Sequence, residues 1–260
     1  MLRIDPIARY FARASRSVAP LILMYHAVSP GRGHPDWLWS VALERFIDQI
    51  ELLRDSGWKF RKVSELANNT APHEGTVAVT FDDGYRNNFP AFEALAARGL
   101  PATWFVVSGN VGRPAAWSDE VTTGWEMLDR GQLLEMSQAG MEIGGHTREH
   151  CRLAEIGAEH LQNQVRGCRE DLEQILGEAV TSFAYPYGSH SDQVVAATQE
   201  AGYKVACTTR AGPAFADADP LRLRRLAVYS HDSLSSFGRK VGLMRNEASW
   251  GRVLENIRTG

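Results

Sequence analysis

The sequence has few cysteines, no excess of positive charge and no long apolar run. Its three cysteines, Cys151, Cys168 and Cys207, are odd in number and widely spaced, which argues against a disulfide framework and a CxxC metal site. The formal net charge is -3, so the chain lacks the basic excess that binds a nucleic-acid backbone. No run of about 18 apolar residues occurs, which disfavours a membrane-spanning helix. We therefore expect a globular protein of a reducing compartment without a nucleic-acid partner.

Residues 1–20 form an N-terminal basic segment. Ile4, Ile7, Phe11 and Ala14 recur at helical spacing with arginines on the other side, a pattern that fits a helix docked on the domain or peripheral contact with a membrane. The apolar run that follows is short and has no A-x-A cleavage site after it, so there is no clear signal peptide. We expect a cytoplasmic protein or one peripheral to the inner membrane, and export stays open.

Short β-like runs alternate with helical patterns after this segment. Strands are predicted at 21–26, 76–81, 102–107, 141–146, 182–185, 203–209 and 223–230, and helices at 41–57, 89–98, 125–139, 154–176 and 192–201. The strands are rich in Val, Ile and aromatic residues without clean polar alternation, which indicates a parallel sheet buried on both faces. About seven strand–helix units in one chain fit a β/α barrel better than two separate domains.

Reactive side chains follow three of these strands. Asp82 and Asp83 come directly after TVAVTF, His146 follows MEIGG, and YPYG follows SFA. In β/α barrels the catalytic groups lie at the carboxyl ends of the strands, so we expect these residues to meet on one face. Gly84 fits a tight backbone turn beside the two acids.

His146 and His150, in HTREH, form a pair that can share a metal ion on one face of a helical turn. The zincin pattern HExxH has the same spacing but needs Glu where this chain has Thr147, so a metalloprotease is rejected. Two histidines and one carboxylate make a catalytic metal site with positions open for water and substrate. The cation also offsets the repulsion between Asp82 and Asp83; one of them binds the metal and the other takes a proton from water.

TFDDGY, HTREH and FAYPYG occur in this order. Together they resemble the motifs of the polysaccharide deacetylase (NodB-homology) family, carbohydrate esterase family 4, and LMYHAV and LPATWFV extend the resemblance over most of the chain. The resemblance implies an α/β fold, a distorted, incomplete (β/α)7-type barrel, with residues 21–260 as the catalytic domain. It also implies a divalent transition metal, most often zinc, and a hydrolase that removes acetyl groups from an N-acetylated poly- or oligosaccharide.

The family motifs also imply a role for each matching residue. The first Asp of TFDDG is the general base in the family, which falls on Asp82, and the second is a metal ligand, which falls on Asp83. The two histidines that complete the metal site match His146 and His150. A mechanism follows in which the metal polarises the acetyl carbonyl and Asp82 deprotonates the attacking water.

Three further residues are candidates for holding the substrate. Tyr187 matches the family residue whose backbone N–H helps to stabilise the oxyanion, and Pro186 precedes it in the same motif. Trp117, in a predicted loop, is a candidate platform for a sugar ring, because aromatic side chains offer large flat contacts. Trp104 lies inside a predicted strand and is expected in the core.

Two departures from the family pattern leave parts of the mechanism open. The third motif usually contains an arginine that steadies the base, but this chain has Ala184 there, and Arg224 or Arg225 is the candidate substitute. The acid for the leaving amine is unassigned, with three alternatives: His231, His190 and His26. A deformylase or other small C–N amide hydrolase, and a weakly active glycan-binding module, stay as alternative functions.

Overall fold

The computed structural model describes residues 6–14, 19–31, 35–67, 74–117 and 121–247. A parallel sheet lies at its centre with strand order β10-β1-β5-β6-β7-β8-β9, and β4 also pairs with β5. The strands are β1 (Leu21–Tyr25), β4 (Lys59–Phe60), β5 (Thr76–Phe81), β6 (Thr103–Val106), β7 (Glu142–Gly145), β8 (Ser182–Ala184), β9 (Val205–Cys207) and β10 (Leu226–Ala227). All residues of β1 and β5 are buried, which confirms the prediction of a sheet covered on both faces.

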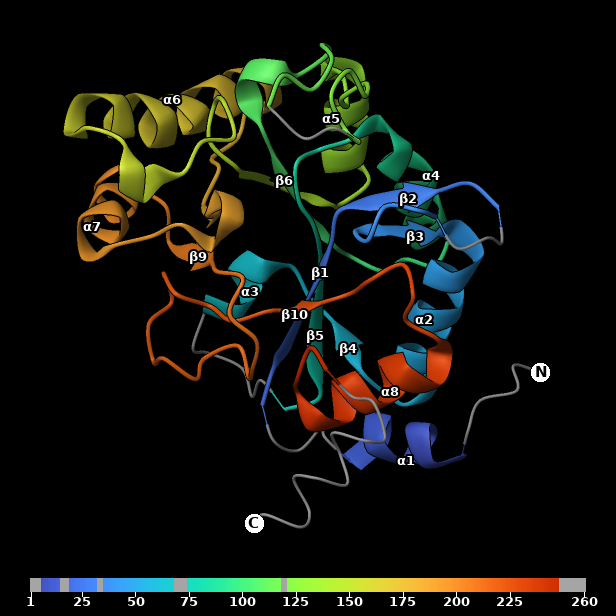
Figure 1. The fold of residues 1–260 in the computed structure, drawn as a ribbon. Coiled ribbons are helices and arrows are strands. Elements are labelled where there is room, and N and C mark those ends of the chain that lie inside the picture. Colours follow the sequence, from blue (N-terminus) through green and yellow to red (C-terminus); the bar gives the residue numbers. More distant parts are fainter. Residues whose placement is uncertain (1–5, 15–18, 32–34, 68–73, 118–120, 248–260) are drawn as a thin grey trace.

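The sheet curls, so that Cys207 at the end of β9 forms an isolated parallel bridge with Leu223, which lies just before β10, while β9 and β10 themselves are not paired. Helices surround it, with α2 and α4 on one side and α6 and α7 on the other (Figure 1). The helices are α1 (Pro6–Ala14), α2 (Leu43–Asp55), α3 (Val63–Ala67), α4 (Phe89–Ala96), α5 (Arg130–Gln138), α6 (Ala158–Leu176), α7 (Asp192–Glu200) and α8 (Leu234–Leu243). The predicted distorted, incomplete β/α barrel is therefore confirmed. A small separate sheet pairs β2 (Ala27–Ser29) with β3 (Ser40–Ala42).

Helix α5 begins later than predicted. Asp129 and Gln132 form a capping box, in which Asp129 Oδ1 accepts the Gln132 N–H at 2.9 Å and Gln132 Oε1 accepts the Asp129 N–H at 3.1 Å. Such a box marks the first turn of a helix, so the helix prediction was wrong for residues 125–129. These residues form a loop that is tied by isolated bridges at Glu126 and Met127.

The apolar face of α1 packs against α8 (Figure 1). Ala8 and Ala12 are fully buried there, and Trp58 Nε1 donates a hydrogen bond to the Ala12 carbonyl at 2.8 Å. Membrane contact through this face is therefore not supported. Residues 1–5 and 15–18 of the predicted basic segment lie outside the described residues. In the described part of the chain, no helix is long and apolar enough to cross a membrane.

Candidate active site

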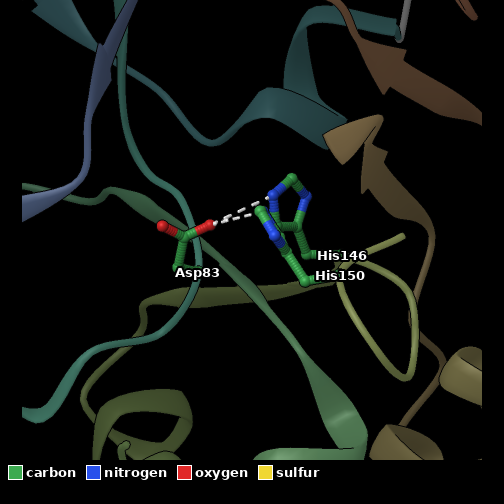
Figure 2. A group of neighbouring side chains, drawn as sticks. All are labelled: Asp83, His146 and His150. Atoms are coloured by element: carbon green, nitrogen blue, oxygen red, sulfur yellow. Dashed lines mark ion pairs between the residues drawn. The ribbon is translucent and has the colours of Figure 1, made fainter. Parts of the chain in front are cut away.

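Three of the predicted site residues come together where β5 and β7 end (Figure 2). Asp83 Oδ1 lies 3.3 Å from His146 Nε2 and 3.1 Å from His150 Nε2. All three side chains are buried. The parallel strands bring these residues together because their carboxyl ends share one edge of the sheet.

The donor atoms of this cluster fit a metal ion. His146 Nδ1 hydrogen-bonds the Ala184 carbonyl at 2.7 Å, which places the proton on Nδ1 and leaves the Nε2 lone pair facing Asp83. Asp83 Oδ1 has no hydrogen-bond partner among the described residues, and such a buried acceptor is costly unless a cation or donor satisfies it. Two imidazoles and one carboxylate are ligands that suit zinc and related divalent metals.

Electrostatics also favour a cation at this position. Burial raises the pKa of the Asp83 carboxyl, but the neighbouring His150, His146 and His26 side chains together outweigh burial and hold the pKa well below its usual range. The two imidazole rings are only 5.1 Å apart, so protonating both would place like charges side by side. A metal ion supplies the counter-charge that Asp83 needs without protonated histidines.

The backbone around the cluster is strained. Four non-glycine residues of the site have left-handed backbone: Asp83 (φ 73°), Thr147 (φ 66°), His150 (φ 54°) and Tyr187 (φ 57°). Such conformations cost about 1–3 kcal/mol each, and they persist where the surrounding structure enforces them. Their concentration here is typical of a functional site.

The HTREH segment is a loop rather than the predicted helical turn. Helix α6 holds it: Gln164 Oε1 accepts the N–H groups of Arg148 and Glu149 at 3.1 and 3.0 Å. Arg148 Nε and Nη2 donate hydrogen bonds to the Asp171 carboxylate at 2.8 and 2.7 Å. The helical prediction was therefore wrong, because contacts with α6 and not local propensity bring the two histidines together.

Asp82 forms a buried ion pair with Arg225, one of the two candidate substitutes for the arginine that the third motif lacks. Arg225 Nη1 and Nη2 lie 2.6 and 2.7 Å from the two Asp82 oxygens, and the Arg225 side chain is fully buried. Arg224, the other candidate, points away and pairs with Asp217. Burial raises the pKa of Asp82, but the charge and hydrogen bonds of Arg225 outweigh it and lower the pKa below its usual value. Asp82 is therefore ionised and fixed in orientation.

A pocket of about 330 Å3 opens over the cluster. Five of its twelve lining residues are tryptophan or tyrosine: Trp37, Trp39, Tyr85, Trp117 and Tyr187. An apolar pocket with a few convergent polar groups is the usual form of a small-ligand site.

The predicted substrate residues occupy different places around this pocket. Trp117 is 8% exposed, and its ring lies 4.7 Å from the ring of His150, so it is a buried wall rather than an exposed platform. Tyr187 is 47% exposed at the rim. Pro186 is buried and is not among the residues that line the pocket. Trp104 is in the core, stacked on Phe81 at 4.5 Å.

Of the three candidate acids, His26 is the one that lines the pocket. Its ring packs on Trp39 at 4.5 Å, and Nδ1 has no hydrogen-bond partner among the described residues. His190 instead binds the Gly188 carbonyl through Nδ1 at 2.7 Å and stacks on Tyr185, and His231 is exposed. The signal in the sequence was the position of His26 directly after a buried strand, the same position that singled out Asp82.

Removal from water lowers the pKa of His26, while the nearby Asp83 and Asp82 carboxylates act in the opposite direction. The net effect is a pKa below the usual value of a histidine. The protonated ring is therefore a stronger proton donor than an exposed histidine.

Comparison with known proteins agrees with this geometry. The Bacillus subtilis protein YxkH is 28% identical over 229 residues, which cover 86% of this chain and 76% of YxkH. The poly-β-1,6-N-acetyl-D-glucosamine N-deacetylase of Staphylococcus aureus is 25% identical over 183 residues, but this chain spans only 60% of its length. Among solved structures, the Streptococcus pyogenes deacetylase PplD in complex with acetate superposes with a TM-score of 0.72 and 26% identity, covering 84% of this chain and 96% of PplD.

The family itself follows from the match to a sequence profile. The profile described as polysaccharide deacetylase matches residues 69–206, more than half of the chain. This range contains Asp83, the histidine pair and Tyr187, which line one pocket, and Asp82, which is not among the lining residues. The chain belongs to the polysaccharide deacetylase family.

Proposed function

We propose that the protein is a metal-dependent hydrolase that removes N-acetyl groups from an N-acetylated poly- or oligosaccharide. The observation that carries the proposal is the meeting of Asp83, His146 and His150 beside the ion-paired Asp82, under an aromatic pocket. Two relatives support the reaction: one is named as an N-deacetylase of poly-β-1,6-N-acetyl-D-glucosamine, and another is a deacetylase solved with acetate.

Asp83, His146 and His150 would hold the metal, with zinc as the first candidate. When bound, a divalent metal polarises the carbonyl of the acetyl group and lowers the pKa of water. Asp82 accepts a proton from the attacking water, and Arg225 keeps its carboxylate ionised and oriented for this step. The Tyr187 N–H donates to the developing oxyanion, and His26 gives a proton to the leaving amine.

Replacing Asp82 with asparagine tests the reaction. Loss of a general base lowers turnover by about 10²–10⁴-fold, while the three metal ligands stay in place. Activity is measured as acetate release from N-acetylglucosamine oligosaccharides, together with the decrease in oligosaccharide mass for each acetyl group lost. Elemental analysis measures the metal content of the variant. Unchanged activity in this variant would exclude Asp82 as the base.

The same assay separates the alternative functions. A deformylase would turn over formamides and release no acetyl group from oligosaccharides of any length. A glycan-binding module would bind the oligosaccharides without releasing acetate. Either outcome, with metal present in the unmodified protein, would overturn the deacetylase proposal.

Replacing His26 with alanine is expected to lower amide hydrolysis by about 10²-fold, since the leaving amine then lacks a proton donor. Hydrolysis of 4-nitrophenyl acetate should fall much less, because its leaving group needs no proton. His190→Ala and His231→Ala are the matched controls and should deacetylate like the unmodified protein. Equal losses on the amide and the ester in His26→Ala would assign His26 a structural role.

A further inference from the structure

Arg152 places a positive charge at the active-site pocket that the mechanism above does not use. The residue is exposed and lines the pocket together with His150 and Tyr187. Among the described residues that line this pocket, it is the only arginine or lysine. A permanent charge at this position bears on which substrates the pocket accepts.

No acidic side chain neutralises Arg152. In the described part of the chain, no carboxylate lies within ion-pair distance of its guanidinium. Glu149, three residues before it, approaches His160 instead, at 3.4 Å. The guanidinium carries five N–H donors, and all of them are therefore available to solvent or to a ligand.

Aromatic packing holds the guanidinium beside the metal cluster. Arg152 Cζ lies 4.3 Å from the centre of the Tyr187 ring, and the Tyr187 ring lies 4.6 Å from that of His150. Stacking on an aromatic face orients a guanidinium and leaves the N–H groups at its edge free to donate. One aromatic ring thus separates Arg152 from a metal ligand, a span similar to that of one substituted pyranose ring.

A second free donor lies beside the same turn. Thr209 lines the pocket, and its Oγ1 packs so closely on Gly188, the residue after Tyr187, that no side chain fits there. The Thr209 hydroxyl forms no hydrogen bond with the described residues. It can therefore donate to an oxygen of a ligand that also reaches Arg152.

The charges around the pocket favour an anion. Asp83 is the one acid among the described lining residues, and the divalent metal that it would bind carries more positive charge than one carboxylate offsets. Asp82 is already paired with Arg225. Nothing then opposes the charge of Arg152, and a cleft with charge of one sign concentrates ligands of the opposite sign.

We propose that the substrate carries an acidic group, a carboxylate or a phosphate, on the sugar that loses its acetyl group, and that Arg152 and Thr209 bind this group. The inference rests on the proposed deacetylase function and deepens it. It assigns the protein an acidic saccharide as substrate and makes Arg152 the residue that distinguishes acidic from neutral sugars.

The test compares N-acetylglucosamine with two acidic forms of it, N-acetylglucosaminuronic acid and N-acetylglucosamine 1-phosphate. In calorimetry on the Asp82→Asn variant, which does not consume the ligand, at least one acidic form should bind about tenfold more tightly than the neutral sugar. The form that shows the gain identifies the acidic group. Salt at about 1 M, where the Debye length is about 3 Å, should remove most of the gain. In the active protein, kcat/KM should show the same preference.

Arg152→Gln should reduce the gain to about twofold or less, because it removes the charge. Arg152→Lys should keep part of the gain, and Thr209→Val, which removes only the hydroxyl, should reduce it severalfold. Arg113→Gln is the matched control and should keep the full gain, since Arg113 is an exposed arginine that does not line the pocket.

Two results would overturn the proposal. One is equal affinity for the neutral sugar and both acidic forms. The other is a full gain in Arg152→Gln, which would place the acidic group on the metal instead. Failure of the proposed function is a separate outcome, because the unmodified protein would then bind the acidic sugars and release no acetate from any of them.

Discussion

Replacing Arg225 with methionine is expected to lower the free energy of unfolding by about 3–5 kcal/mol, because it leaves the Asp82 carboxylate buried without its counter-charge. Both side chains are almost inaccessible to water, and two short hydrogen bonds join them. Denaturant unfolding at neutral pH measures the effect. Arg224→Met is the matched control, since Arg224 pairs with Asp217 nearer the surface and its loss should cost about 1 kcal/mol or less.

The pH profile separates this electrostatic role from a purely structural one. In the unmodified protein the pKa of Asp82 is below its usual value, so the ionised, proton-accepting form is lost only as pH falls through that low pKa. Without Arg225, burial still raises the pKa and nothing of equal size opposes it. The acid limb of the kcat/KM profile should therefore move to higher pH in Arg225→Met. An acid limb that stays in place would show that Arg225 does not set the charge of Asp82.

Replacing His146 with alanine is expected to release the metal and abolish deacetylation. Changes to groups that merely support a metal ligand cost about 10–100-fold in affinity, so loss of a ligand should cost at least on the order of 100-fold. Elemental analysis after dialysis measures occupancy. Zinc at about 100 times its Kd should stabilise the unmodified protein by about 2.7 kcal/mol, and the variant should show no such gain.

The control for this variant is His160→Ala. His160 lies on α6, is half exposed, and approaches Glu149 of the same loop at 3.4 Å without joining the metal cluster. It should keep full metal content and the full stabilisation by zinc. If His146→Ala also retained stoichiometric metal after dialysis, His146 would not be a ligand.

Much of the fold could be predicted from local pattern. TVAVTF forms a strand over its predicted residues 76–81, since β-branched and aromatic residues favour a pleated, buried surface. The meeting of Asp83 with His146 also followed from the sequence, because parallel strands place their carboxyl ends at one edge. The wrong start predicted for helix α5 was avoidable. Asp129 and Gln132 have the spacing of a capping box, and this box marks the first turn of the helix.

Other features depend on contacts between residues far apart in the chain. Arg224 and Arg225 are chemically identical neighbours, but β10 is only two residues long, so the sequence carries no periodic pattern that says which one turns inward. The structure turns Arg225 toward Asp82 and Arg224 toward Asp217. The HTREH loop is a similar case. Thr147 and His150 in this loop have a left-handed backbone, which local propensity disfavours, and Gln164 on α6 holds the loop by accepting the Arg148 N–H.

The sequence by itself determined which reactive groups this protein carries: two acids directly after one strand, and a histidine pair that begins directly after another. The tertiary structure decided how these groups are arranged. It paired Asp82 with Arg225, chose His26 over two other histidines for the pocket, and set Trp125 beside Trp37. The physical reason is the separation along the chain of the residues that interact. Strand and helix signals act over a few neighbouring residues, whereas ion pairs and pocket walls form between distant segments that only the folded chain brings together.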